Sequence, residues 1–167
     1  MIQIFDNFIP EETFNQVKTQ VLSTDFLWNC VPTNYNEETL SFGKNYINKD
    51  QLDDISEIKN VADNLKQIFN FGDLKRIRVG LIHRDNEYKI HAKHVDYTKP
   101  HITVLWYLYG EDGDTYFYDG DGNTIARVTP KQNRLVVFDG LIEHSSSTPV
   151  KEQIRIAINF NFNLKEE

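Results

Sequence analysis

The side chains of this chain best suited to chemistry are two histidines and an aspartate. His94 and Asp96 are separated by the single residue Val95, and His144 lies much further along the chain. On an extended segment, residues two apart point to the same side, so His94 and Asp96 can reach one metal ion together. His144 would then supply a third ligand from a different strand. Two imidazoles and one carboxylate form the ligand set that holds a non-haem ferrous ion and leaves its opposite face open.

Each of these residues also has an ordinary alternative role. His94 and Asp96 could be a surface histidine and a turn aspartate in a polar loop. His144 could bond to the three serines that directly follow it. An isolated H-x-D is a weak signal, so the metal interpretation depends on what accompanies it.

An arginine follows the second histidine, at position 155, inside an alternating segment over 154–162. The isoleucines of this segment point one way, and the opposite face carries Arg155, Ala157, Asn159 and Asn161. An arginine is costly to bury without an anion, and its planar guanidinium suits two-pronged capture of a carboxylate. A solvent-facing side of an edge strand is the alternative, which the asparagines would also fit.

The elements that must position these residues change character near residue 76. Before it, apolar residues at helical spacing predict one helix opened by Pro10 and another over about 50–69, with a short strand over 2–8 ahead of them. From Arg76 onward a period of two predicts strands over 76–82, 101–109, 115–118, 124–128, 134–138 and 154–162. Residues 29–48 are interpreted as loop and edge strand. Helices followed by many antiparallel strands indicate an α+β chain with a β-sandwich or barrel.

Composition narrows the function classes. The chain has 167 residues, enough for one domain, and 40% of them are hydrophobic, which allows a core. The net charge of −7 argues against broad nucleic-acid binding, which needs a basic surface. Cys30 is the only cysteine, which fits a reducing compartment. The longest apolar run, 102–109, is far shorter than the ~20 residues of a membrane helix. With no evident signal peptide, we expect a soluble cytoplasmic protein.

Four stretches of sequence, taken in order, resemble the 2-oxoglutarate- and Fe(II)-dependent oxygenases, in their prolyl 4-hydroxylase-like branch. They are KHVDY (93–97), HITVLWYLYGEDGDTYFYD (101–119), VTPKQNRLVVFDGLIEH (128–144) and QIRIAINFNF (153–162). An H-x-D, a strand with a tyrosine, a distal histidine and a following arginine form a strong signal when they occur together. The first half matches more loosely, through an opening IQIFDNFIPEETF that is similar to the start of short phage-type members.

The resemblance implies a fold and a domain plan. The fold would be a double-stranded β-helix, a jelly-roll or cupin-like barrel, with the N-terminal helices packed on one sheet. Residues 1–167 would form a single domain, with helical support and edge strands over 1–75 and the catalytic barrel core over 76–163. Residues 29–48 and 84–92 are the segments that we expect to cover a substrate.

The resemblance also implies roles for individual residues. His94, Asp96 and His144 would hold Fe(II), and Arg155 would bind the distal (C5) carboxylate of 2-oxoglutarate. Two residues of the 101–109 strand would assist: Tyr107 by a hydrogen bond to the same carboxylate, and Thr103 from the same strand face, although both could equally be core residues. O₂ would be the second cosubstrate, with ascorbate as an optional reductant.

The implied activity is hydroxylation of an unactivated C–H bond, with decarboxylation of 2-oxoglutarate to succinate. The substrate would be a small molecule or a peptide, with a peptidyl proline as one candidate suggested by analogy. The alternatives are a cupin-like metal enzyme that does not use 2-oxoglutarate and a non-catalytic binding module. Of the other histidines, His83 and His91 are expected to line the pocket, and His101 to be structural.

Overall fold

The computed structural model describes residues 1–31, 41–46 and 55–165. Much of the expected 29–48 cover and the start of the predicted 50–69 helix lie outside these residues. The helices are α1 (Glu11–Leu22) and α2 (Ser56–Phe69). The strands are β1 (Ile2–Asp6), β2 (Asn29–Val31), β3 (Ser41–Tyr46), β4 (Leu74–His83), β5 (His101–Tyr109), β6 (Thr115–Tyr118), β7 (Thr124–Val128), β8 (Arg134–Asp139), β9 (His144–Ser146) and β10 (Ile154–Asn163).

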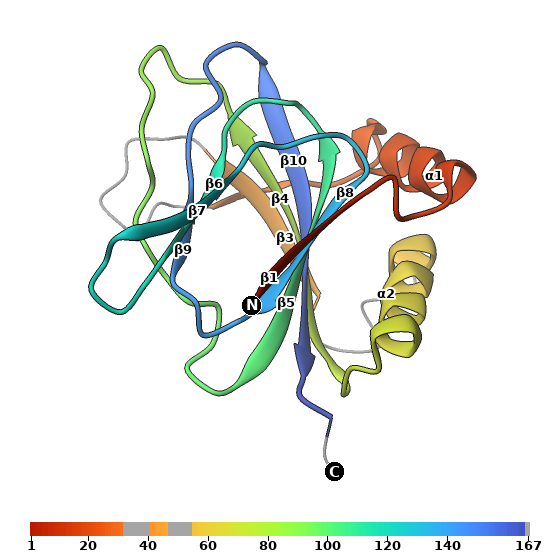
Figure 1. Cartoon of the computed structure of the whole chain (residues 1–167). Coiled ribbons are helices and arrows are strands. Elements are labelled where there is room, and N and C mark those ends of the chain that lie inside the picture. Colours follow the sequence, from red (N-terminus) through yellow and green to blue (C-terminus); the bar gives the residue numbers. More distant parts are fainter. Residues whose placement is uncertain (32–40, 47–54, 166–167) are drawn as a thin grey trace.

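The strands form two sheets with antiparallel neighbours. The major sheet has seven strands in the order β1-β8-β5-β10-β4-β3-β2, and the minor sheet has three in the order β7-β6-β9. Figure 1 shows the minor sheet on one side of the major sheet and both helices on the other. This is the architecture of a double-stranded β-helix with helices on one sheet, as predicted. One detail differs: within the described residues, the ladders between strands do not close into a barrel.

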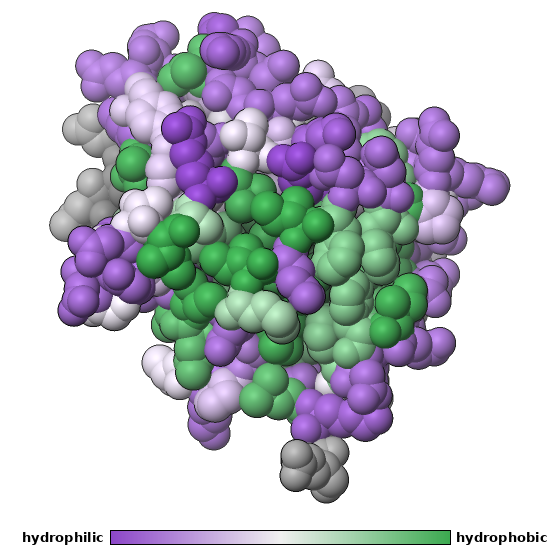
Figure 2. All heavy atoms as spheres, in the orientation of Figure 1, coloured by the Kyte–Doolittle hydropathy of each residue, from purple (hydrophilic) through white to green (hydrophobic). Residues whose placement is uncertain are grey.

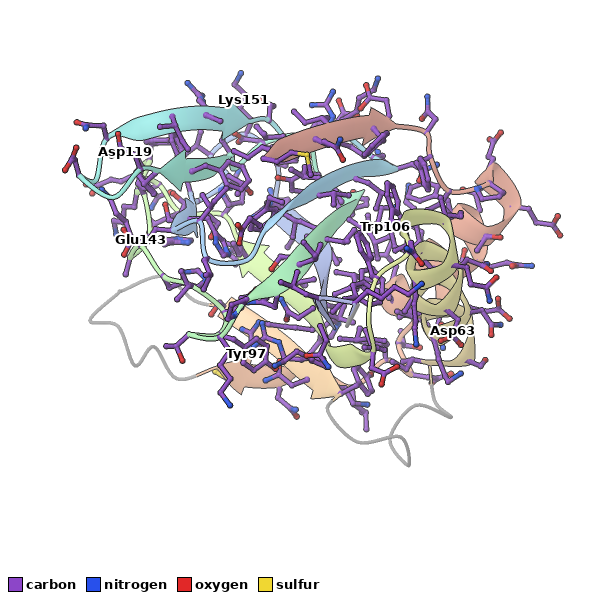
Figure 3. All side chains as sticks on the ribbon, turned by 60° about the horizontal axis from the view of Figure 1, so that its bottom comes forward. Asp63, Tyr97, Trp106, Asp119, Glu143 and Lys151 are labelled. Carbon is purple, nitrogen blue, oxygen red and sulfur yellow. The ribbon has the colours of Figure 1, made fainter. Side chains whose placement is uncertain are left out.

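The two helices pack on the outer face of the major sheet. α1 begins at Glu11, with Pro10 as its N-cap in an extended conformation rather than as the first helical residue. Trp106 of β5 is fully buried under the helices, in edge contact with Phe14 of α1 at a ring-centroid distance of 6.1 Å; its surroundings are visible in Figure 3. α2 ends at Phe69. Its C-cap is Asn70, which has a left-handed backbone (φ 57°) that asparagine tolerates at a helix end.

A second, smaller core lies between the sheets. Tyr107, Val136 and Phe138 of the major sheet pack against residues of β6 and β7, chiefly Phe117 and Val128. The burial of these side chains brings the inner faces of the two sheets together. Figure 2 shows one face of the molecule, where hydrophobic side chains gather centrally and hydrophilic ones surround them.

The segment between β4 and β5 extends the minor sheet. It forms two isolated antiparallel bridges, His94–His144 with the first residue of β9 and Ile90–Ser147 with the residue that follows β9. Residues 84–100 are otherwise irregular, so this segment is held by a few contacts rather than by a continuous ladder. It thereby places the H-x-D residues beside β9.

Candidate metal centre

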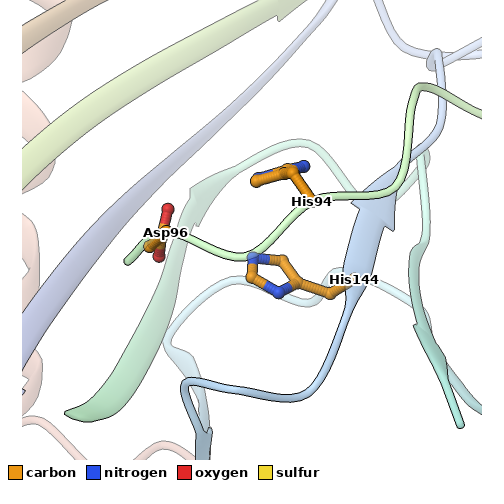
Figure 4. A group of neighbouring side chains, drawn as sticks. All are labelled: His94, Asp96 and His144. Atoms are coloured by element: carbon orange, nitrogen blue, oxygen red, sulfur yellow. The ribbon is translucent and has the colours of Figure 1, made fainter. Parts of the chain in front are cut away.

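The two candidate histidines are held together by their own backbones. The His94 amide donates to the His144 carbonyl at 3.0 Å, and the His144 amide donates back to the His94 carbonyl at 3.0 Å. Residues paired in this way project their side chains to the same face of a sheet. Their ring centroids are 4.6 Å apart, and both rings lie beside Asp96 in Figure 4.

The three side chains fit a single metal ion. One ligand atom from each of His94, Asp96 and His144 lies within 4.8 Å of the other two. Nitrogen and oxygen ligands about 2.1 Å from a common ion lie up to about 4.2 Å apart, so small side-chain rotations bring this set around one ion. The structure therefore gathers the residues that the sequence predicted.

Both imidazoles present the same nitrogen to this centre. His94 Nδ1 lies 3.2 Å from the Ala92 carbonyl oxygen, and His144 Nδ1 lies 3.0 Å from the Ile142 carbonyl oxygen. A carbonyl oxygen can only accept, so each Nδ1 carries a hydrogen, and in the neutral form of each ring the lone pair is on Nε2. Such backbone contacts fix the tautomer and the ring orientation of histidines that bind metals.

The protonation states also suit a cation. Burial lowers the pKa of His144, as does the neighbouring His94, so His144 stays neutral. Burial by itself would raise the pKa of Asp96, but the Arg76 charge and hydrogen bonds from Asn161 and Asn159 outweigh it and hold that pKa well below its usual range. A neutral His144 imidazole and an ionised Asp96 carboxylate result.

A buried cation, Arg155, projects from the same face of β10 as Asn159 and Asn161. Arg155 is 4% exposed, and no carboxylate of the described residues lies within 4.0 Å of its guanidinium. Its Nη2 donates to Thr115 Oγ1 at 3.0 Å, while its buried Nε has no partner among the described residues. Its guanidinium carbon lies 5.1 Å from the centroid of the Tyr107 ring, and Tyr107 Oη also donates to Thr115 Oγ1, at 2.8 Å. The solvent-facing alternative for Arg155 is wrong.

Thr103 does not share the hydrogen bonds of Arg155 and Tyr107. It is fully buried and accepts a hydrogen bond from Asn161 Nδ2 at 3.0 Å, and Asn161 in turn contacts Asp96. Thr103 therefore belongs to the surroundings of Asp96, whereas Arg155 contacts Thr115. Its role toward a cosubstrate stays a prediction.

The remaining histidines differ from one another. His83 is exposed and its Nδ1 lies 2.7 Å from the Arg84 carbonyl oxygen. His91 is partly buried, with Nδ1 2.8 Å from Ser146 Oγ. His101 is 1% exposed and packs edge-on against Tyr97, in keeping with a structural role.

Sequence reasoning missed several residues of the site. The sequence places Thr115 only in a strand and Arg76 only at the start of another. It places Asn159 and Asn161 on the Arg155 face of their strand, where they would also fit a solvent-facing surface, and predicts no contact with Asp96. Their shared face with Arg155 was the available signal, because every second residue of a strand faces the same side.

Comparison with known proteins identifies the family. The family model for the 2OG-Fe(II) oxygenase superfamily matches residues 79–163, which contain all the candidate ligands and Arg155. A comparison with curated protein sequences gives no significant match.

Solved structures share the fold at low sequence identity. A prolyl 4-hydroxylase from Pseudomonas putida superposes with a TM-score of 0.74 at 15% identity, covering 98% of this chain and 92% of that one. A prolyl hydroxylase from Trichoplax adhaerens, in complex with a hypoxia-inducible-factor peptide, gives 0.74 at 15% identity, with 97% and 83% coverage. HygX from Streptomyces hygroscopicus, with nickel and 2-oxoglutarate bound, gives 0.66 at 10% identity, with 98% and 83% coverage.

Among the described residues, no helix is both long and apolar enough to cross a bilayer.

The family match covers half of the chain, the fold agrees along nearly all of it, and a His-Asp-His cluster lies within the matched region. The chain belongs to the 2OG-Fe(II) oxygenase superfamily, and is an oxidoreductase that uses Fe(II), 2-oxoglutarate and O₂.

Proposed function

We propose that this protein is a hydroxylase in which His94, Asp96 and His144 hold Fe(II). The mutual distances within 4.8 Å, the two Nδ1–carbonyl contacts that leave Nε2 for a metal and the ionised carboxylate support this assignment. Iron bound there would supply activation of O₂ coupled to decarboxylation of 2-oxoglutarate. One oxygen atom of O₂ would end in succinate, with loss of CO₂, and the other would be inserted into a C–H bond of the substrate as hydroxyl.

Arg155 is the residue that we assign to the C5 carboxylate of 2-oxoglutarate. Its burial without a carboxylate partner among the described residues is the single observation that carries the proposed function. A buried cation is strongly unfavourable until an anion pairs with it, and a guanidinium binds a carboxylate with two parallel hydrogen bonds. Tyr107 and Thr115 would complete the pocket: Thr115 Oγ1 already accepts two hydrogen bonds, so its own hydrogen is available to a carboxylate oxygen.

The protein's contribution is orientation and exclusion of water. The inter-sheet core beside the centre, which includes Phe117 and Phe138, is almost completely buried, and the Phe138 ring lies 5.0 Å from the His144 ring. A dry, apolar wall strengthens the electrostatic contacts within the site and limits side reactions. We also propose that residues 1–167 act as one domain, because one buried cluster joins both helices to the major sheet.

The class of substrate that we propose is a peptide, with a proline residue as the first candidate for hydroxylation. Support comes from the two prolyl hydroxylases among the similar structures, one of which holds a peptide. The net charge of −7 makes nucleic acid the less suitable substrate.

The test is turnover by the purified protein with Fe(II), 2-oxoglutarate and O₂. We expect succinate to form slowly without substrate and faster with proline-containing peptides, whose mass should rise by one oxygen atom. Asp96→Ala is the control and should form no succinate. Metal binding without any consumption or binding of 2-oxoglutarate would instead favour the cupin-like alternative.

A further inference from the structure

The carboxylate of Asp96 is held by side chains of the major sheet. In the segment between β4 and β5, His94 is the last residue with a backbone bridge to β9. Asp96 lies beyond that bridge, and residues 95–100 form no strand. Three side chains of the major sheet donate to it: Arg76 of β4, and Asn159 and Asn161 of β10. The direction of this ligand is therefore set by side chains of the opposite sheet and not by its own backbone.

The three donors are divided unequally between the two oxygens. Arg76 Nη2 donates to Asp96 Oδ1 at 2.6 Å. Asn159 Nδ2 and Asn161 Nδ2 both donate to Oδ2, each at 2.9 Å. A carboxylate oxygen offers two lone-pair positions, so Oδ2 is fully engaged and Oδ1 keeps one position.

The amide of Asn161 has little freedom to turn over. Its Oδ1 accepts from Arg76 Nε at 2.9 Å, and its Nδ2 donates both to Asp96 and to Thr103 Oγ1 at 3.0 Å. A reversed amide would place an oxygen against the carboxylate and a nitrogen against the guanidinium. The side chain is fully buried, so no solvent would compensate for that loss.

Asn159 makes a simpler contact. Within the described residues, the side chain of Asn159 forms one hydrogen bond, from its Nδ2 to Asp96. Its buried Oδ1 has no partner among the same residues. Its amide therefore has no evident role apart from holding Asp96.

We propose that Asn159 and Asn161 are positioning residues that occupy Oδ2 of Asp96 and leave Oδ1 as the one oxygen that binds the metal. The inference rests on the proposed function, in that it takes Asp96 as a metal ligand. It goes further by naming the residues that keep this ligand monodentate and ready before the metal arrives. Hydrogen bonds to ligating carboxylates are known to tune metal affinity in this way, typically by 10–100-fold.

A matched pair of substitutions tests the proposal. Asn159 and Asn45 are the two cross-strand neighbours of Arg78, on β10 and β3. Asn159 contacts Asp96, whereas Asn45 Oδ1 accepts from Arg78 Nη1 at 3.3 Å. Asn159→Ala and Asn45→Ala thus remove the same amide from the two strands that flank β4, and only the first removes a contact with the candidate ligand.

The measurement is titration of the metal-free proteins with Co(II), followed by its visible absorption, with thermal unfolding of each protein as a check on folding. We expect Asn159→Ala to bind Co(II) about tenfold more weakly than the parent, at the lower end of the range for such contacts, with a changed absorption spectrum. Asn45→Ala should match the parent. Equal affinity for both variants and the parent would overturn the inference, as would an equal loss in both.

A crystal structure of the unmodified protein with Mn(II) is a second test that does not depend on a variant folding. We expect a bond from Asp96 Oδ1 alone, with both amides still on Oδ2. Binding through Oδ2 or through both oxygens would contradict the inference while leaving the proposed function intact. Failure of the parent protein to bind Co(II) or Mn(II) would instead refute the proposed function itself.

Discussion

Replacing Arg155 with methionine should stabilise the metal-free protein and weaken its binding of 2-oxoglutarate. The guanidinium is 4% exposed, donates one hydrogen bond, to Thr115, and has a buried Nε without a partner among the described residues. Methionine has a similar length, no charge and a flexible shape that fills irregular apolar space. The substitution therefore removes an unfavourable buried charge at the same time as the proposed anion contact.

The gain in stability follows from opposing contributions. The effective penalty for burying one ion is several kcal/mol, about 3–5 kcal/mol when its partner is missing. The cation–π contact with the Tyr107 ring at 5.1 Å offsets about 1–2 kcal/mol of this. The hydrogen bond to Thr115 offsets about 1 kcal/mol more. With the middle of each range, the remainder is about 1.5 kcal/mol, which should raise the melting temperature by about 3–6 °C for a chain of this size.

The loss in binding should be larger. Removing one partner of a buried charged pair typically costs about 2–5 kcal/mol, and each 1.4 kcal/mol is a factor of ten, so 2-oxoglutarate should bind at least about 30-fold more weakly. The assay is thermal unfolding with chelator alone, then a titration of 2-oxoglutarate in the presence of Mn(II). Arg134→Met is a control, because Arg134 is paired with Asp6 at 2.6 Å and its loss should neither stabilise the protein nor affect 2-oxoglutarate.

The reasoning would be refuted by an Arg155→Met protein that melts below the parent and binds 2-oxoglutarate as tightly. A lower melting temperature would mean that Arg155 is compensated in the metal-free protein. Unchanged binding would mean that the pocket holds no carboxylate.

Three further substitutions have expected outcomes. His94→Ala should abolish Co(II) binding in titrations while leaving the far-ultraviolet circular dichroism spectrum unchanged, because its ring is exposed and its backbone bridge remains. Asp6→Asn should lower the free energy of unfolding at pH 7 by about 0.5–1 kcal/mol, since Asp6 is a partly exposed partner of Arg134. Because hydrogen bonds from Arg134 hold the pKa of Asp6 below its usual range, denaturant titrations should show this difference at neutral pH and lose it as the pH falls well below 4. Gly140→Ala should lower the free energy of unfolding by about 1–3 kcal/mol, and with it the melting temperature, because a Cβ at this position would overlap the ring of the buried His101. An unchanged melting temperature would mean that the ring moves freely.

Much of the sheet structure was predictable from alternation. The strands over 101–109, 115–118 and 124–128 have the bounds that the sequence predicted, because side chains alternate between two faces with different surroundings. β2 and β3 were less predictable, since residues 29–48 are rich in asparagine, threonine, tyrosine and glutamate and the pairing of β3 with β4 is a long-range contact. The N-terminus of α1 differs by one residue, because Pro10 has an extended backbone that precedes the helix.

The candidate site divides in the same way. The grouping of His94 with Asp96 was predictable because it is a local property of an extended chain. The pairing of His94 with His144 needed the chain to return through β9, and the contacts of Asp96 with Arg76 and Asn161 needed the register of β4 against β10. Thr115 was not predictable as a neighbour of Arg155, because the two residues are brought together from different sheets.

The sequence by itself determined which side chains could bind a metal and a diacid, since residue type and strand alternation are local properties. It also determined that Arg155, Asn159 and Asn161 share one face of a strand. Only the tertiary structure decided that this face points inward, because burial depends on the second sheet packing over it. The same packing decided that Asp96 is held by asparagines from the opposite sheet, since hydrogen bonds between distant segments follow from strand register and not from spacing along the chain.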